Sequence, residues 1–242
     1  MHSAPGQAEF PTTRWTLIAS AGNVRDPDSR RALESLCAAY WYPLYAFVRR
    51  RGSSPEQAQD HTQDFFARIL EHGYFDRADR EKGRFRSFLL SAFKAYLCGA
   101  FDHDHAVKRG GGIQMFAFEV SNGEEMYARE PVCDETPERI YERRWALTLL
   151  DRVMEGLRDE FVRHGRLDHF NRIKFALLGE ASIPYANLAR ELETNEASLK
   201  VGIHRLRKRY REILRAEVAD LVADPADVDS ELRFLISAVG KK

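Results

Sequence analysis

The chain has 242 residues, 44% of them hydrophobic and 31% charged, and its 37 Lys and Arg residues balance its 37 Asp and Glu residues. With a mean hydropathy of -0.48 it has enough apolar material for real cores, so we do not expect wholesale disorder. It has no run of about 18 uncharged apolar residues, which excludes a membrane span.

Two features of the sequence indicate where in the cell the protein is located. Residues 1–10 lack a basic segment followed by an apolar one, so no secretion signal is expected. Cys37, Cys98 and Cys133 are far apart and odd in number. They suit a reducing cytoplasm better than a disulfide framework or a zinc knuckle. We therefore expect a cytoplasmic protein.

Helical periodicity dominates the first part of the chain. Apolar residues follow i, i+3, i+4 spacing from Leu33 to Val48, where Pro43 is expected to bend or locally break the helix. Residues 52–55 end this helix and start a second. Its inward positions are Ala58, Thr62, Phe65, Phe66, Ile69 and Leu70. A third helix is predicted from about Arg84 to Phe101, with an inner side made of Phe85, Phe88, Leu89, Ala92, Phe93, Tyr96 and Leu97.

The pattern then stops and resumes. Residues 110–112 are three glycines, and the mixed sequence after them predicts a linker over residues 113–139. Periodicity returns at Ile140 and continues in several helices to about Val222. The prediction is an all-α chain of two small helical domains, residues 29–112 and 140–222. An N-terminal extension (1–28) precedes them and an acidic tail (223–242) follows.

Charge is concentrated near the end of the second domain. Between residues 200 and 215 the only acid is Glu212, and the basic residues are Lys200, Arg205, Arg207, Lys208, Arg209, Arg211 and Arg215. The sign then reverses with Glu217, Asp220, Asp224, Asp227, Asp229 and Glu231. A neutral chain with one basic helix has a localised electrostatic footprint.

The basic helix is the second part of a predicted helix-turn-helix. Residues 184–192 make a short helix, residues 193–195 a polar break, and Asn195 is suited to cap the next helix. That helix turns Leu199, Ile203, Leu206, Ile213 and Leu214 inward. Such a helix fits the DNA major groove. We expect base contacts from Lys200, Val201, His204 and Arg205, and phosphate contacts from Arg207, Lys208, Arg209 and Arg211. The alternative is a basic amphipathic helix that only solvates one face.

Two stretches of the chain resemble a known family in the family's own order. Ile183-Pro-Tyr-Ala-Asn-Leu-Ala-Arg-Glu-Leu and Ala197-Ser-Leu-Lys-Val-Gly-Ile-His-Arg-Leu-Arg resemble the second helix-turn-helix of bacterial RNA polymerase sigma factors of the extracytoplasmic-function type. Residues 60–68 resemble that family's polymerase-binding helix. Residues 85–94 resemble the segment that melts and reads the upstream edge of the transcription bubble. The resemblance covers roughly residues 33–109 and 147–219.

The resemblance implies a role for each matched segment. The first domain corresponds to sigma region 2, and the second to sigma region 4, which reads the minus-thirty-five element. Asp60, Gln63, Asp64 and Arg68 would face a coiled coil of the largest polymerase subunit. The residues that would hold the displaced strand of the minus-ten element are Phe88, Lys94, Tyr96, Lys108 and Arg109. For Phe88 and Tyr96, and for Phe65 and Phe66, simple core packing is the alternative. The chain would be non-catalytic, with no cofactor, and its partners would be RNA polymerase core and promoter DNA.

The sequence departs from the family in three places. The polymerase-binding helix has few acids in its first turns, because Gln57 and Gln59 leave only Glu56 and Asp60. Thr62 is a candidate phosphosite for a Ser/Thr kinase, since phosphate would add negative charge there; the alternative is an unmodified threonine that fills a helix interface. The N-terminal extension is expected to pack Trp15, Leu17 and Ile18 on the first domain. The acidic tail either folds over the DNA-binding face or forms a plain terminal helix.

Two further functions are weaker alternatives. A free-standing helix-turn-helix regulator would bind duplex DNA without polymerase. A metal-dependent hydrolase would need the sequence Asp102-His103-Asp104-His105 to hold an ion, but adjacent residues on a helix point in different directions. No other metal or nucleophile motif is present. The sequence leaves open whether an anti-sigma factor, a kinase or the tail controls the protein.

Overall fold

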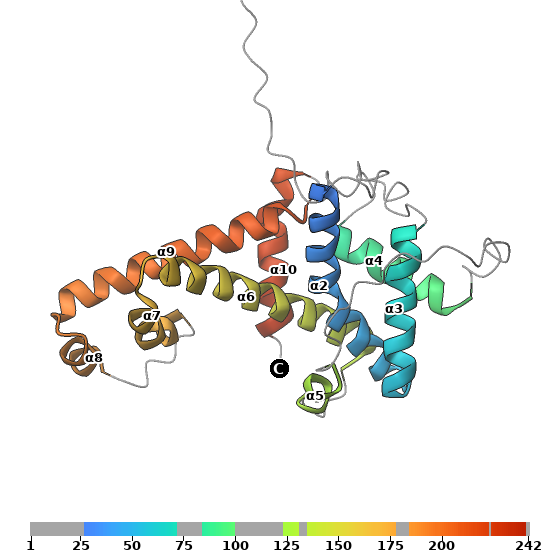
Figure 1. Ribbon diagram of the computed structural model, residues 1–242, viewed down its shortest axis with the longest axis horizontal. Helices are drawn as coiled ribbons and strands as arrows, with labels where there is room; N and C mark the ends of the chain where they lie inside the picture. The colour runs from blue at the N-terminus through green and yellow to red at the C-terminus, as the bar shows by residue number, and fades with distance from the viewer. Residues whose placement is uncertain are drawn as a thin grey trace, which may run out of the picture. The chain divides into compact units, whose positions relative to one another are not determined.

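The computed structural model describes residues 27–71, 84–99, 123–130, 135–177, 184–222 and 224–240, and all regular elements there are helices (Figure 1). They are α2 (Pro27–Arg50), α3 (Pro55–Glu71), α4 (Phe85–Leu97), α5 (Gly123–Ala128), α6 (Pro137–Arg163), α7 (Leu167–Ile173), α8 (Tyr185–Glu191), α9 (Glu196–Ala219) and α10 (Val228–Gly240). Two short 3₁₀ segments, η4 (Lys174–Leu177) and η5 (Pro225–Asp227), join them. The predicted all-α class is confirmed for these residues.

Internal contacts divide the chain into two compact units. The first unit is Met1–Trp145 with Ala219–Lys242, and the second is Ala146–Val218. The division therefore falls inside α6 and at the end of α9.

The core of the first unit is largely aromatic. α3 contacts both α2 and α4. The Phe93 ring of α4 lies with its centroid 4.7 Å from that of Phe65 on α3 and 6.1 Å from that of Phe47 on α2. Five of the six inward positions predicted for α3 are confirmed, because Ala58, Thr62, Phe65, Phe66 and Ile69 are all buried; the side chain of Leu70 lies outside the described part of the chain. α2 is continuous through Pro43, so the expected local break is absent.

The start of α3 follows from its sequence. The Ser54 hydroxyl accepts a hydrogen bond from the Gln57 backbone N–H at 3.2 Å. In return the Gln57 side-chain oxygen accepts one from the Ser54 N–H at 3.0 Å. This reciprocal capping box satisfies two amide donors that the first turn of a helix leaves without partners.

Part of the segment predicted as a linker is packed structure. α5 contacts α2, and Glu124 accepts hydrogen bonds from the Tyr45 hydroxyl at 2.6 Å and from Arg49 at 2.9 Å. Gly123 lies so close to the Trp41 ring that a Cβ atom would approach it to 2.8 Å. Six helical residues are too few to produce a visible period, which is why the sequence pattern does not indicate α5. Residues 113–122 and 131–134 lie outside the described part of the chain.

The acidic tail contains α10, which belongs to the first unit. Glu231 is buried and its carboxylate contacts Arg86 at 2.6 Å and Arg84 at 2.8 Å. The Arg86 guanidinium also lies 3.5 Å from the centroid of the Phe234 ring. Tyr141 of α6 donates to the Arg86 carbonyl at 2.9 Å. Of the two alternatives for the tail, these contacts favour the terminal helix.

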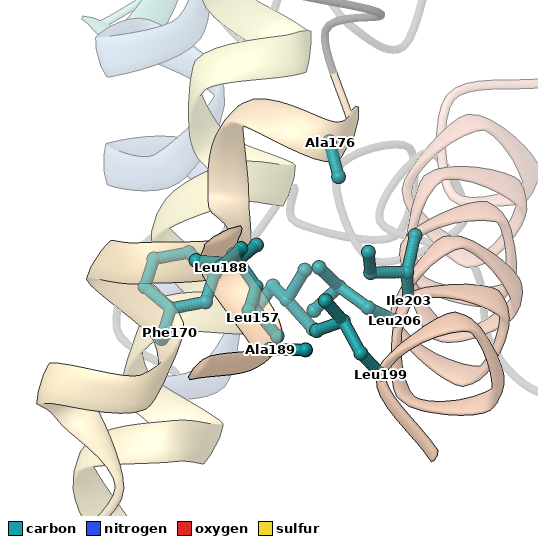
Figure 2. Close-up of a cluster of buried hydrophobic side chains, with 9 residues drawn as sticks. Leu157, Phe170, Ala176, Leu188, Ala189, Leu199, Ile203 and Leu206 are labelled. Atoms are coloured by element: carbon teal, nitrogen blue, oxygen red, sulfur yellow. The ribbon is translucent and has the colours of Figure 1, made fainter. Parts of the chain in front are cut away.

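The second unit is built around one hydrophobic cluster (Figure 2). Its buried members come from five successive elements: Leu157 (α6), Phe170 and Ile173 (α7), Ala176 (η4), Leu188 and Ala189 (α8), and Leu199, Ile203 and Leu206 (α9). Ala189 of α8 is a small residue of this cluster, to which Leu199 of α9 also belongs. The cluster therefore holds α8 and α9 together as a pair with a shared core.

Candidate nucleic-acid interface

The turn between α8 and α9 has a defined backbone geometry. The Thr194 N–H donates to the Ala189 carbonyl at 2.9 Å, and the Glu193 N–H donates to the Arg190 carbonyl at 3.2 Å. These two bonds form a Schellman motif, and Glu193 takes the left-handed position with φ 50°. The chain thus reverses between the helices within four residues, 192–195.

Asn195 begins α9 as the sequence predicts. Its side-chain oxygen accepts a hydrogen bond from the Ser198 N–H at 2.8 Å, and its carbonyl accepts one from the Leu199 N–H at 3.0 Å. An Asn side chain at this position satisfies an amide that has no partner inside the helix. The cap fixes the residue at which α9 starts, and so fixes which residues of the helix face outward.

The faces of α9 are as predicted near its start. Leu199, Ile203 and Leu206 are buried in the cluster of Figure 2. Ile213 is partly buried against the same cluster. The opposite face is exposed, and its residues are Ala197, Lys200, Val201, His204, Arg205, Lys208 and Arg211. Four residues predicted to reach base edges (Lys200, Val201, His204 and Arg205) therefore lie on one accessible surface.

Among the described residues, the cations of this face form weak ion pairs with acidic neighbours or form none. Lys200 is 3.5 Å from Glu196 and Lys208 is 3.9 Å from Glu212, with all four side chains about half exposed or more. Exposed i,i+4 pairs of this kind contribute little and exchange readily with other anions. Among the described residues Arg205 and Arg211 have no ion-pair partner. This face is therefore available to a polyanion.

Two arginines predicted to meet phosphates have partners inside the second unit. Arg207 donates to the Ala176 carbonyl of η4 from two nitrogens, at 3.1 and 2.8 Å. Arg209 contacts Glu160 of α6 at 2.5 Å and Glu212 at 3.2 Å. These bonds raise the pKa of Arg209 and lower that of Glu160. Both arginines brace α9 against neighbouring elements, a role that the sequence pattern did not indicate.

Comparison with protein families, with curated proteins and with solved structures finds no match to this chain.

In the first unit, α3 presents the residues predicted to bind polymerase. Asp60 is exposed, and Gln63, Asp64 and Arg68 are partly exposed along the same side of the helix. Asp64 accepts hydrogen bonds from Arg68 at 2.9 Å and from the Tyr96 hydroxyl of α4 at 2.6 Å. Tyr96, which the sequence assigned to the minus-ten element, thus contacts the α3 face directly.

Phe88 and Lys94, two other residues predicted for the minus-ten element, have different contacts. Phe88 is partly buried, with its ring centroid 6.3 Å from that of Phe85. Lys94 forms an ion pair with Glu138 of α6 at 2.6 Å, and this pairing lowers the pKa of Glu138. Lys108 and Arg109 lie outside the described residues.

Thr62 is inaccessible at its position in α3. Its side chain is 0% exposed, and its hydroxyl donates to the Ala58 carbonyl at 2.7 Å. A kinase could reach this hydroxyl only if α3 separated from its neighbours. The position therefore favours the alternative in which an unmodified threonine fills the helix interface.

The structure adds two observations on other kinds of site. The described residues contain no group of acidic, His or Cys side chains placed to hold a metal ion. Residues 102–105, and the extension with Trp15, Leu17 and Ile18, lie outside the described residues. In the described part of the chain, no helix combines the length and apolar character that crossing a membrane requires.

Proposed function

We propose that this protein is a transcription initiation factor of the extracytoplasmic-function sigma type, which binds RNA polymerase core and directs it to promoter DNA. The observation that carries the proposal is the outward face of α9. A helix that displays Lys200, His204 and Arg205 opposite a closed apolar core has the size and charge to enter a major groove. We infer RNA polymerase as the partner from the resemblance of both halves of the sequence to sigma factors.

The second unit supports a reading role for this face. The Schellman turn and the Asn195 cap fix α9 relative to α8, and Arg207 and Arg209 anchor its middle to η4 and α6. A recognition surface needs such rigid support, because base contacts depend on positions held to a fraction of an ångström. The exposed residues of α9 would then contact the minus-thirty-five element.

The first unit supports a protein partner. Asp60 and Asp64 are one turn apart on an exposed side of α3, and Asp64 is held in place by Tyr96 and Arg68. Asp60 and Asp64 form a short strip of two carboxylates, of which Asp64 is paired with Arg68, and such a strip suits a surface of complementary charge on a partner. We assign this strip to the polymerase coiled coil, with α4 next to it.

Run-off transcription on a library of bacterial DNA fragments tests the function. Core polymerase with the full chain should initiate at defined sites at which core alone does not. The Arg205→Ala variant should reduce these transcripts about tenfold or more, since one good base contact contributes on the order of 1–3 kcal/mol. Arg172→Ala removes an exposed cation from α7 instead, and should leave the transcripts unchanged.

The rival, a free-standing regulator, gives a different result. It would bind duplex DNA tightly by itself and add no start sites to core polymerase. Chain-independent transcription combined with such binding would overturn the sigma-factor proposal.

A further inference from the structure

Val201 lies on the outward side of the basic face of α9. A helix advances by about 100° per residue, which places residue 201 opposite the buried row of Leu199, Ile203 and Leu206. Its side chain is 50% exposed. Ala197, one turn earlier, is exposed as well. The two side chains form an apolar spot beside the exposed Lys200, His204 and Arg205.

Val201 is an apolar residue among exposed polar and cationic neighbours, Lys200, His204 and Arg205. Valine loses side-chain freedom in a helix and is a weaker helix former than Lys, Arg or Ala. Lys200 and Arg205, on either side of it, are exposed and would attract phosphates to the rims of this surface. The residue between them would then face the floor of whatever groove α9 enters.

We propose that Val201 is a specificity-determining residue that contacts the methyl group of a thymine on the floor of the DNA major groove. This inference rests on the proposed function, because it requires α9 to lie in that groove. Thymine is the base that presents a methyl group there, and apolar side chains recognise it by contact. The ligand chemistry is therefore a duplex with a thymine opposite the first turns of α9.

Arg205 extends the reading by one turn. It lies about 6 Å further along the helix axis than Val201, which corresponds to roughly one or two base-pair steps of duplex. Arginine is suited to the O6 and N7 acceptors of guanine. The preferred element should therefore contain a thymine and a guanine at neighbouring or nearly neighbouring positions.

The test begins with the complex of the full chain and core polymerase, which selects preferred duplexes from a randomised minus-thirty-five region. Each thymine of the selected element is then replaced by deoxyuridine, which lacks only the methyl group. Affinity should fall about fourfold at one position, the loss expected for one buried methyl group, and should not change at the others.

Variants connect that position to the residue. Val201→Ala should bind the selected duplex about fourfold more weakly and should no longer distinguish thymine from deoxyuridine there. Val162→Ala is the matched control, because Val162 is another exposed valine of the second unit, 45% exposed on α6. This control should keep the full discrimination.

Three results overturn the inference. Wild-type protein that binds every deoxyuridine duplex equally well has no methyl contact. A Val201→Ala variant that keeps the discrimination assigns the contact to another residue. If the Val201→Ala variant binds core polymerase more weakly but still distinguishes thymine from deoxyuridine, Val201 contacts a protein. In all three the wild-type chain still directs the run-off transcripts, which separates these failures from failure of the proposed function, in which the wild-type chain gives none.

Discussion

Arginines of similar sequence context have different roles along α9. Arg205 is exposed and has no ion-pair partner among the described residues, whereas Arg207 donates twice to the Ala176 carbonyl. The sequence predicted both as DNA contacts. A backbone acceptor 31 residues away becomes a neighbour only through the packing of η4 on α9, so local periodicity could not separate the two.

This difference predicts that alanine substitution of Arg207 lowers stability, whereas alanine substitution of Arg205 lowers promoter binding. Arg207→Ala should lower the free energy of unfolding by about 1–3 kcal/mol, because it removes charge-assisted hydrogen bonds to a partly buried carbonyl. Arg205→Ala should leave the unfolding free energy unchanged within about 0.5 kcal/mol and weaken promoter binding. Denaturant unfolding of both variants checks this. Equal stability of the two variants would contradict the bracing role of Arg207.

Thr62 gives a second residue-scale prediction. Its side chain is fully buried, so Thr62→Asp should cost about 3 kcal/mol or more by placing an unpaired carboxylate in the core. Ser91→Asp, at an exposed position of α4, should change stability little. Thermal unfolding measures both variants, and a Thr62→Asp protein as stable as wild type would restore the phosphorylation hypothesis.

At the scale of elements, the sequence predicted those helices whose apolar positions repeat. It predicted α3, α4, the short α8 and the start of α9 from the helical period. Side-chain caps mark only α3, at Ser54, and α9, at Asn195, since the cap positions of α4 and α8 form no side-chain hydrogen bond. It missed α5, whose position depends on Glu124 reaching Tyr45 and Arg49 of α2. The contacts of α10 were also beyond it, since a buried pair such as Arg86–Glu231 joins residues far apart in the sequence.

The buried pair at α10 predicts a strong effect of one neutralising substitution. Glu231→Gln should destabilise the first unit by about 3–5 kcal/mol, because it leaves the buried Arg86 without its counter-charge. Glu155→Gln, at an exposed position of α6, is the matched control and should have almost no effect. Hydrogen exchange localised to α4 and α10 measures the change, and unchanged protection in Glu231→Gln would show that α10 is not held by this pair.

At the scale of the whole molecule, lowering the pH should destabilise both units. Arg209 holds the pKa of Glu160 in the second unit below its usual value of 4.5, and Arg49 does the same for Glu124 in the first. A carboxylate whose folded-state pKa is lowered contributes stability above its unfolded pKa, and this contribution is lost as pH falls through the folded pKa.

The stability difference between wild type and Glu160→Gln should therefore be constant near neutral pH and shrink as pH falls below 4.5. High salt should reduce it as well, because the pair is partly exposed. Unfolding curves at a series of pH values check both dependences. A difference that grew on acidification would contradict the ion pair between Arg209 and Glu160.

The functional proposal rests on two compact units, one with the strip of Asp60 and Asp64 on α3 and one with a basic face on α9. Neither surface is large, so we expect each to act through polymerase rather than alone. The sequence pointed to the residues of both surfaces; only the structure shows that Tyr96 contacts the strip rather than standing separately.

The central claim is tested most directly by titrating the fluorescently labelled full chain with RNA polymerase core in the absence of DNA. We expect saturable binding with a Kd below about 1 µM, weakened in Asp60→Ala and Asp64→Ala and retained in Arg172→Ala. Absence of saturable binding to core, from a folded chain that nonetheless binds duplex DNA alone, would contradict it.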